Sequence, residues 1–314
     1  MLLSNRDKTA ITYKGTKYSY NQVLIYSQDY ADCFASAGKP QKVLICGQNS
    51  PEWCFAFLGA IRLKAIAVPL DAQSTKKEIE YVINDCKPDI VFITADKKEL
   101  FGEINLCGAR LLTPNEIKLS ESENVPTSEI PMGAAEETML INYTSGTTGS
   151  PKGVMLSYKN VMYNVDSVSK SVPIYQEVSN VMVLLPLHHI LPLLGSLVAP
   201  LHVGGTIHIA EAMNAESIIK TLNEGKISII IGVPRLYDML VKGVMNKINA
   251  SFITRFLYKA VKFIGSDSVS KIVFSSVHKK FGGHLKYLVS GGAALSIETA
   301  TILKTLGLYV LEGY

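Results

Sequence analysis

The sequence has little charge, and its cysteines form no disulfide or zinc-binding pattern. Charged residues are 18% and hydrophobic residues 47% of its 314 positions, which excludes an intrinsically disordered chain. The five cysteines include no Cys-x-x-Cys pair, so we expect free thiols and a cytoplasmic location. The N-terminus becomes charged too early for a signal peptide. A net charge of +4 is too weak to indicate a nucleic-acid partner.

Residues 180–210 contain no Asp, Glu, Lys or Arg. A membrane-spanning helix needs about 20 uninterrupted apolar residues. Pro186, Pro192 and Pro200 interrupt this segment, and His188, His189 and His202 add polar groups. We therefore expect a buried strand, a buried helix and a second buried strand.

Elsewhere, short apolar runs alternate with helical patterns along the whole chain, which predicts an α/β fold with mostly parallel sheets flanked by helices. We expect two such subdomains, at 1–180 and 181–314, with a linker or surface excursion at 115–137. Predicted strands lie at 11–13, 17–19, 43–46, 65–68, 89–93, 138–143, 181–185, 206–209, 227–231, 285–289 and 308–311. Predicted helices lie at 19–37, 51–63, 74–86, 215–223, 234–245, 251–264 and 296–306, and another begins after Ser157.

The segment from Tyr143 to Gly153 reads Tyr-Thr-Ser-Gly-Thr-Thr-Gly-Ser-Pro-Lys-Gly. Glycines allow backbone N–H groups to approach an anion closely, and the hydroxyls and the lysine add phosphate donors. The spacing fits neither a Walker A loop nor a Rossmann glycine pattern. We predict a polyphosphate site in a turn between a strand and a helix. Its residues are Thr144, Ser145, Gly146, Thr147, Thr148, Gly149 and Lys152.

This loop, continued by Val154, matches the signature of the adenylate-forming superfamily, and further motifs carry the resemblance along the chain. The segment Leu185-Pro-Leu-His-His189 resembles the "LPLxH" segment of acyl-CoA synthetases. Gly232-Val-Pro-Arg-Leu-Tyr237 resembles a turn of the fatty-acid-activating branch, and Glu312-Gly-Tyr314 resembles the start of "EGYGxTE". One departure is Lys64, which stands where the family usually has glycine.

The resemblance implies the large N-terminal domain of the adenylate-forming fold, truncated before its C-terminal lid domain. In this family ATP and Mg²⁺ activate a carboxylic acid as an acyl-adenylate, and coenzyme A then takes the acyl group. The resemblance implies that the distal phosphates of ATP bind the glycine-rich loop and that His189 lies near the reacting carboxylate. The adenine would lie against Gly291, Gly292, Ala293, Glu312, Gly313 and Tyr314.

Two of these assignments have plainer alternatives: His189 as a structural histidine, and the Gly-Gly pair as a simple tight turn. His188 is left out, because in an extended segment its side chain would point away from that of His189. No metal ligand is assigned within the chain.

Residues 180–210 contain no aspartate that would hold an amino-acid ammonium group, so we expect a fatty-acid substrate. The alternatives are transfer to an acyl carrier protein and a non-catalytic nucleotide- or acyl-binding module. Because the expected Mg²⁺-binding glutamate and lid lysine do not occur, we expect weak nucleotide binding and no complete adenylation by this chain alone.

Residues 242–286 contain nine Lys or Arg and one acid, Asp267. Within this region, 251–264 has apolar residues at helical spacing, which predicts a basic amphipathic helix. Such a helix either lies on an anionic membrane or is an ordinary surface helix with a solvated basic face. The sequence alone leaves both interpretations open.

Overall fold

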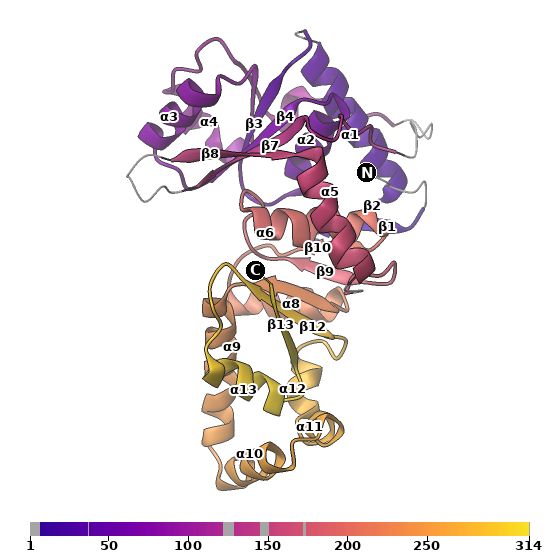
Figure 1. Ribbon diagram of the computed structural model, residues 1–314, viewed down its shortest axis with the longest axis vertical. Coiled ribbons are helices and arrows are strands. Elements are labelled where there is room, and N and C mark those ends of the chain that lie inside the picture. The colour runs from indigo at the N-terminus through magenta and orange to yellow at the C-terminus, as the bar shows by residue number, and fades with distance from the viewer. Residues whose placement is uncertain (1–6, 37, 122–128, 145–150, 172–173, 314) are drawn as a thin grey trace. The chain divides into compact units, whose positions relative to one another are not determined.

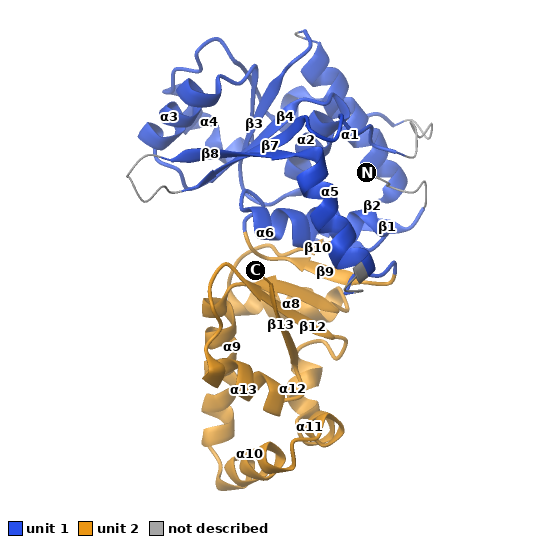
Figure 2. Ribbon diagram, viewed as in Figure 1, with its two compact units in different colours: residues 1–177, 186–206 blue, residues 178–185, 207–314 orange. Residues whose placement is uncertain are grey.

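A computed structural model shows the chain as two compact units (Figures 1 and 2). It describes residues 7–36, 38–121, 129–144, 151–171 and 174–313. Unit 1 contains Met1–Glu177 and Pro186–Thr206, and unit 2 contains Val178–Leu185 and Ile207–Tyr314. The chain therefore enters unit 2 briefly and returns to unit 1 before completing unit 2.

Unit 1 is built on a six-stranded sheet with the order β6-β5-β3-β4-β7-β8. Its first five strands in this order run parallel, and β8 pairs antiparallel with β7. The helices between the strands make the crossovers that parallel strands require. The strands are β3 (Lys42–Cys46), β4 (Ile66–Leu70), β5 (Ile90–Ile93), β6 (Arg110–Leu112), β7 (Thr138–Thr144) and β8 (Lys152–Ser157). The helices among them are α2 (Pro51–Arg62), α3 (Lys76–Cys86) and α4 (Lys98–Gly102), with short 3₁₀ turns at Ala95–Lys97 and Pro114–Glu116.

An N-terminal hairpin, β1 (Thr9–Tyr13) with β2 (Thr16–Ser19), leads directly into helix α1 (Tyr20–Ala35). Ser19 forms a capping box with Gln22, because each side chain binds the backbone N–H of the other. Helix α1 packs against α2 through the buried Arg62, whose Nε donates to Ser27 Oγ at 2.8 Å. Burial lowers the pKa of this guanidinium, and the hydrogen bonds to α1 compensate for part of the lost hydration.

The rest of unit 1 is helical, and part of it has the wider π-type geometry. Helix α5 (Tyr158–Asp166) begins after Ser157, whose side chain accepts the N–H of Asn160, and continues into a π-turn at Ser167–Ser171. After the chain returns from unit 2, α6 (Ile190–Pro192), a π-segment (Leu193–Val198) and α7 (Ala199–His202) follow one another. Pro192 and Pro200 thus lie within a short, broken helix. None of the helices in the described ranges is long and apolar enough to span a bilayer.

In unit 2, five neighbouring strands have the order β13-β12-β11-β9-β10. The pairs β9–β11, β11–β12 and β12–β13 are parallel. The apolar core lies between these strands and the helices that connect them. The strands are β9 (Asn180–Val183), β10 (Thr206–Ile209), β11 (Ile229–Gly232), β12 (Tyr287–Gly291) and β13 (Tyr309–Gly313). The helices are α8 (Ala215–Glu224), α9 (Pro234–Asn249), α10 (Phe252–Ile264), α11 (Asp267–Val273), α12 (Ser275–Lys280) and α13 (Ile297–Thr305).

The predicted fold class, two α/β units with mostly parallel sheets, is confirmed, with local corrections. Strand β4 does not end before Pro69, which pairs with Ile45 of β3. Proline is tolerated in a strand where its missing N–H is not needed for the ladder, and Pro69 keeps the register of β4 with β3. Strands β6 and β8 were not predicted, and β8 separates the glycine-rich segment from α5.

The departure at Lys64 has a conformational consequence. Lys64 has a φ of +55°, in the left-handed region that normally favours glycine. Its N–H donates to Ile61 O at 2.9 Å, and Ala65 N–H donates to Ala60 O at 3.0 Å. These two bonds form a Schellman motif that ends α2, with a lysine at the usual glycine position.

We therefore expect Lys64→Gly to stabilise the protein, because glycine adopts a positive φ without the steric cost of about 1 kcal/mol or more. Lys64 is exposed, so loss of its side chain removes little packing. Urea unfolding should show a gain of about 1 kcal/mol. Lys64→Ala is the matched control, because it removes the same side chain and keeps the steric cost of a positive φ. Equal stability of the two variants would contradict this explanation.

Candidate functional site

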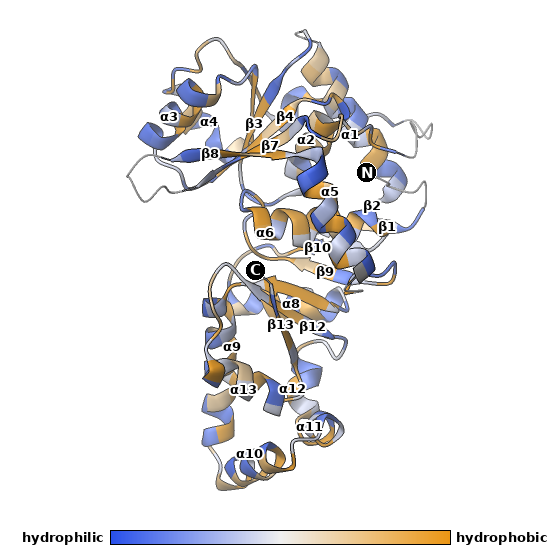
Figure 3. Ribbon diagram, in the orientation of Figure 1, coloured by the Kyte–Doolittle hydropathy of each residue, from blue (hydrophilic) through white to orange (hydrophobic). Residues whose placement is uncertain are grey.

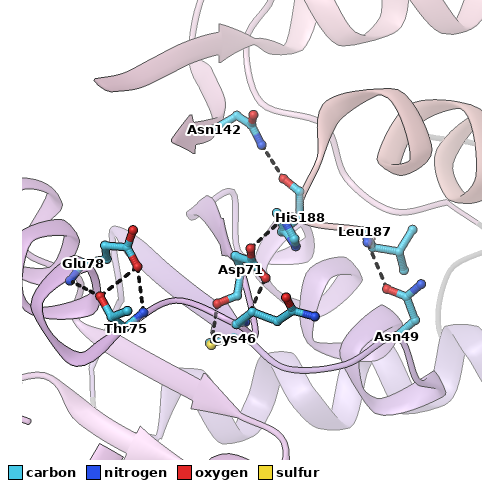
Figure 4. A network of polar contacts seen from close by, with 9 residues as sticks. Cys46, Asn49, Asp71, Thr75, Glu78, Asn142, Leu187 and His188 are labelled. Carbon is cyan, nitrogen blue, oxygen red and sulfur yellow. Dashed lines mark hydrogen bonds and ion pairs between the residues drawn. The ribbon is translucent and has the colours of Figure 1, made fainter. Parts of the chain in front are cut away.

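The first group of candidate residues gathers at the carboxyl ends of parallel strands in unit 1, where ligands of α/β folds commonly bind. Asn49 follows β3, and its Oδ1 accepts the N–H of Leu187 at 2.9 Å. Asn142 on β7 donates from Nδ2 to the carbonyl of His188 at 2.6 Å. Asp71 follows β4 and faces the His188 ring (Figure 4). Two side-chain amides thus hold the turn that carries both histidines.

His188 and His189 lie side by side in this turn, so the expectation that their side chains point apart is wrong. The segment is not extended, because His189 N–H donates back to Pro186 O at 3.2 Å. The two ring centroids are consequently 4.0 Å apart. The His188 side chain is largely buried, whereas His189 is exposed at the start of α6. Polar residues after β3 and β4 were the sequence signal that would have drawn attention to His188.

Burial determines the charge of His188. Removal from water, followed by the neighbouring His189, lowers its pKa from 6.5 to about 4 against the opposing effect of Asp71. The 3.7 Å contact between His188 Nε2 and Asp71 Oδ2 is therefore not an ion pair at neutral pH. Within the described part of the chain, Nε2 has no hydrogen-bond partner. The turn thus presents a neutral imidazole beside an exposed one.

Cys46, at the end of β3, belongs to the same network without being reactive. Its thiol donates to the backbone oxygen of Asp71 at 3.6 Å. Burial raises the pKa of this thiol to about 12, so it stays protonated at neutral pH. Because thiolates, not thiols, are the nucleophiles, Cys46 has a structural role here.

The two ends of the predicted phosphate loop lie on paired strands. Thr144 ends β7 and Lys152 begins β8, and the antiparallel register places these two residues opposite each other. Both are exposed. The segment therefore connects two antiparallel strands instead of a strand and a helix, which corrects the expected setting. Ser145, Gly146, Thr147, Thr148 and Gly149 lie outside the described residues.

Gly153, next to Lys152, is required by close packing. A Cβ at this position would lie 2.8 Å from Ile141 Cγ2 and 3.1 Å from the Tyr143 ring. Tyr143 pairs with Gly153 across the strands and donates its hydroxyl to Asp85 at 2.6 Å. Burial and this hydrogen bond raise the pKa of Tyr143. These contacts lie beside the last pairs of the β7–β8 ladder, which include Lys152.

The second group of candidate residues lies at the carboxyl ends of β12 and β13 in unit 2. The parallel register places Gly291 opposite Gly313 and Ser290 opposite Glu312. The Glu312 carboxylate also accepts the N–H of Leu295 at 3.3 Å. The structure thus brings together five of the six predicted adenine-binding residues: Gly291, Gly292, Ala293, Glu312 and Gly313. The sixth, Tyr314, lies outside the described residues.

The turn after β12 is exposed and leaves space beside Gly292. Gly292 has a φ of +78°, and a Cβ added there would meet nothing closer than 3.8 Å. The glycine is therefore needed for its backbone conformation and not for space. Gly292 and Ala293 are exposed, and Ser296 caps α13 just beyond them. The geometry is compatible with a nucleotide base and equally with a tight turn alone.

The Gly-Val-Pro-Arg-Leu-Tyr segment has a structural explanation within unit 2. Tyr237 is fully buried, and its hydroxyl donates to Val289 O at 2.7 Å and lies 3.2 Å from Ile230 O. A Cβ on Gly232 would lie 2.8 Å from the Tyr237 oxygen. The glycine and the tyrosine therefore fit together to join β11 and β12 near their carboxyl ends.

No cluster of three or more His, Cys, Asp or Glu side chains in the described ranges could hold a metal ion. Mg²⁺ therefore remains a prediction, as a partner of ATP. The assignments of His189, the loop and the glycine turn to a ligand also remain predictions.

Comparisons with known proteins agree with this architecture. Residues 3–314 match the model of the AMP-binding enzyme family. Long-chain-fatty-acid–CoA ligase 1 of Schizosaccharomyces pombe is 34% identical over 219 residues, which cover 63% of this chain and 32% of that protein. The human long-chain-fatty-acid–CoA ligase ACSBG2 is 25% identical over 342 residues, which cover 93% of this chain and 51% of that protein.

Two solved structures share the fold. ATP-bound MatB from Rhodopseudomonas palustris has a TM-score of 0.76 and 23% identity, over 99% of this chain and 57% of that one. The inhibitor-bound N-terminal domain of FACL13 from Mycobacterium tuberculosis has a TM-score of 0.74 and 19% identity, over 98% of this chain and 72% of that one.

The fold is thus that of the N-terminal domain of adenylate-forming enzymes. The chain belongs to the AMP-binding enzyme family. It spans between about a third and a half of the length of the two curated relatives described above.

The environment of His188 predicts a specific pH dependence of stability. Its folded pKa of about 4 lies below the ordinary 6.5, so between these values the unfolded chain binds more protons. The free energy of unfolding should therefore decrease as the pH is lowered from 6.5 to 4. The contribution of this group is on the order of 3 kcal/mol. Urea unfolding at neutral pH and near pH 4 measures the loss, which should be smaller in His188→Gln by that amount.

His189→Gln is the companion variant. It removes the neighbouring charge that lowers the His188 pKa, so the imidazole signal of His188 in NMR titration should move to a higher pH. An unchanged His188 titration in this variant would contradict the coupling of the two rings.

Proposed function

We propose that this chain forms part of an enzyme that activates a fatty acid with ATP and transfers the acyl group to coenzyme A. The observation that carries the proposal is the phosphate-loop signature at 143–153, within a family match over residues 3–314. A carboxylate oxygen would attack the α-phosphorus of ATP, and the bond to pyrophosphate would break. The CoA sulfur would then attack the acyl carbonyl carbon, and AMP would leave.

The chain's own residues would mainly position charge, which is the main task when two anionic groups must meet. Lys152 projects from the first position of β8, where an ammonium group would bind the distal phosphates. His189, exposed at the start of α6, would contact the carboxylate or the α-phosphate. Mg²⁺ bound to ATP would neutralise part of the phosphate charge.

Two observations favour a fatty acid over an amino acid. Residues 180–210 contain no acidic side chain that would bind a substrate ammonium group. The two curated relatives described above are both named as long-chain-fatty-acid–CoA ligases. Another relative is a feruloyl-CoA synthase, so the acid has to be identified by experiment.

Pyrophosphate release with ATP and Mg²⁺ tests the proposal, over fatty acids of increasing length, ferulate and amino acids. We expect little turnover from this chain alone and fatty-acid-dependent turnover from any longer product of its reading frame. Thioester analysis with CoA and acyl carrier protein as competing acceptors identifies the second step. Turnover with amino acids would refute the fatty-acid assignment. Failure of the longer protein to turn over any of the acids would refute it as well.

Lys152→Met should weaken ATP binding by about 10- to 100-fold, because a charged hydrogen bond contributes about 1.5–3 kcal/mol. Isothermal titration with MgATP measures the change. Lys159→Met is the matched control: this exposed lysine pairs with Glu136 at 2.8 Å, and its loss removes the same charge a short distance along the chain. Equal weakening by both variants would indicate a general charge effect and contradict a specific role of Lys152.

A further inference from the structure

Helix α10 exposes large apolar side chains to solvent. Phe252, Phe256 and Phe263 are 76%, 63% and 93% exposed, whereas Val261 on the same helix is only 2% exposed. Ile253 and Ile264 are also exposed. These five exposed residues are called the α10 patch. Exposed apolar groups of this size are unusual outside interaction surfaces.

The helical geometry shows that the α10 patch is a continuous stripe. At about 100° per residue, the three phenylalanines lie within about 40° of one another around the helix. Ile253 and Ile264 continue the stripe on one side. Val261, which packs into the core of unit 2, lies on the opposite side of the helix from the phenylalanines. Most of the apolar residues that give α10 its helical periodicity therefore face solvent and not the core of unit 2.

Basic residues lie along the other edge of this stripe. Arg255, Lys259 and Lys262 are exposed and fall within about 80° of Phe252 around the helix. No acidic residue occurs in α10, and the surrounding region 242–286 has nine basic residues against one acid. Figure 3 shows α10 with alternating apolar and polar stretches. The apolar stripe and its cationic edge together complement a partner surface that has an apolar interior and an anionic boundary.

The location of α10 separates the patch from the glycine turn. Helix α10 lies at the end of unit 2 that is far from strands β12 and β13 (Figure 2). An apolar groove of about 590 Å³ lies beside it, between helices α8, α9, α10, α11 and α12, and Leu257 of α10 borders this groove. The exposed apolar surface of α10 is thus continuous with a recessed one.

We propose that the α10 patch docks unit 2 onto an anionic lipid bilayer. The phenylalanines would enter the interface between headgroups and acyl chains, and Arg255, Lys259 and Lys262 would contact lipid phosphates and carboxylates. This inference does not depend on the proposed ligase activity. A bilayer is favoured over a second copy of the chain because the nine-to-one basic excess would face itself in a symmetric dimer.

Vesicle flotation at low salt tests the proposal, with phosphatidylcholine alone and with about one third phosphatidylserine. We expect binding to the anionic vesicles that weakens as salt is added. The triple variant Arg255→Gln/Lys259→Gln/Lys262→Gln should bind on the order of 100-fold more weakly, since each cation contributes about fivefold. Lys76→Gln/Lys77→Gln/Lys98→Gln is the control, because it removes three exposed unit 1 charges and should retain binding.

The apolar contribution is tested by Phe256→Ser/Phe263→Ser, which should lose most binding to anionic vesicles. Ile297→Ser, at an exposed position on α13, is its control. Circular dichroism melting verifies that all variants fold. Absence of vesicle binding, or equal binding by patch and control variants, would overturn the proposal. Self-association that disappears in the double variant, without vesicle binding, would instead assign the patch to an interface between copies.

A tryptophan reporter distinguishes insertion from simple charge attraction. The single natural tryptophan, Trp53, is buried in unit 1, so its emission should change little. Phe256→Trp should show blue-shifted emission with anionic vesicles and quenching by lipids brominated near the top of the acyl chains. Ile297→Trp should show neither effect. A Phe256→Trp spectrum unchanged by bound vesicles would refute insertion of the patch.

Discussion

The candidate site of unit 1 depends on two side-chain amides that bind the backbone of one turn. Asn49 accepts the N–H of Leu187, and Asn142 donates to the carbonyl of His188. Both amides are placed by parallel strands, so the turn takes its position from the sheet and not from its own sequence. This turn brings the two imidazoles together at a tilt and buries one of them beside Asp71. Burial in this turn is the main cause of the lowered pKa of His188.

Features set by local sequence could be predicted, whereas features that depend on contacts between distant residues could not. Strand β10 was predicted with its observed bounds, Thr206–Ile209, and α10 within one residue, because a short apolar run and a helical period are local signals. Likewise, Ser157 was correctly predicted to cap α5. The resemblance to adenylate-forming enzymes identified the family from linear motifs alone. Local pattern thus accounts for most elements and for the family.

What could not be predicted depends on partners distant in sequence. Strand β8 exists because β7 offers it an antiparallel ladder, and the segment Lys152–Ser157 alone gives no strong strand signal. The orientation of His188 was missed because a linear pattern does not show the turn that Asn49 and Asn142 hold. Gly232 and Tyr237 were assigned to a family turn, whereas their fit to each other is visible only in the packed core. In each case a tertiary contact determined the structure because the local sequence preference was weak.

Helix α10 shows a different limit, since its periodicity was predicted correctly while the direction of its apolar side was not determined. A hydrophobic stripe at helical spacing indicates only that one side of a helix avoids water. In α9 the buried residues Leu236, Tyr237 and Val241 belong to the core of unit 2, whereas in α10 that core takes Val261 and leaves three phenylalanines outside. The core of unit 2 is thus formed without them. A stripe that folding does not bury needs another low-polarity environment, and the basic residues along its edge favour one with an anionic boundary.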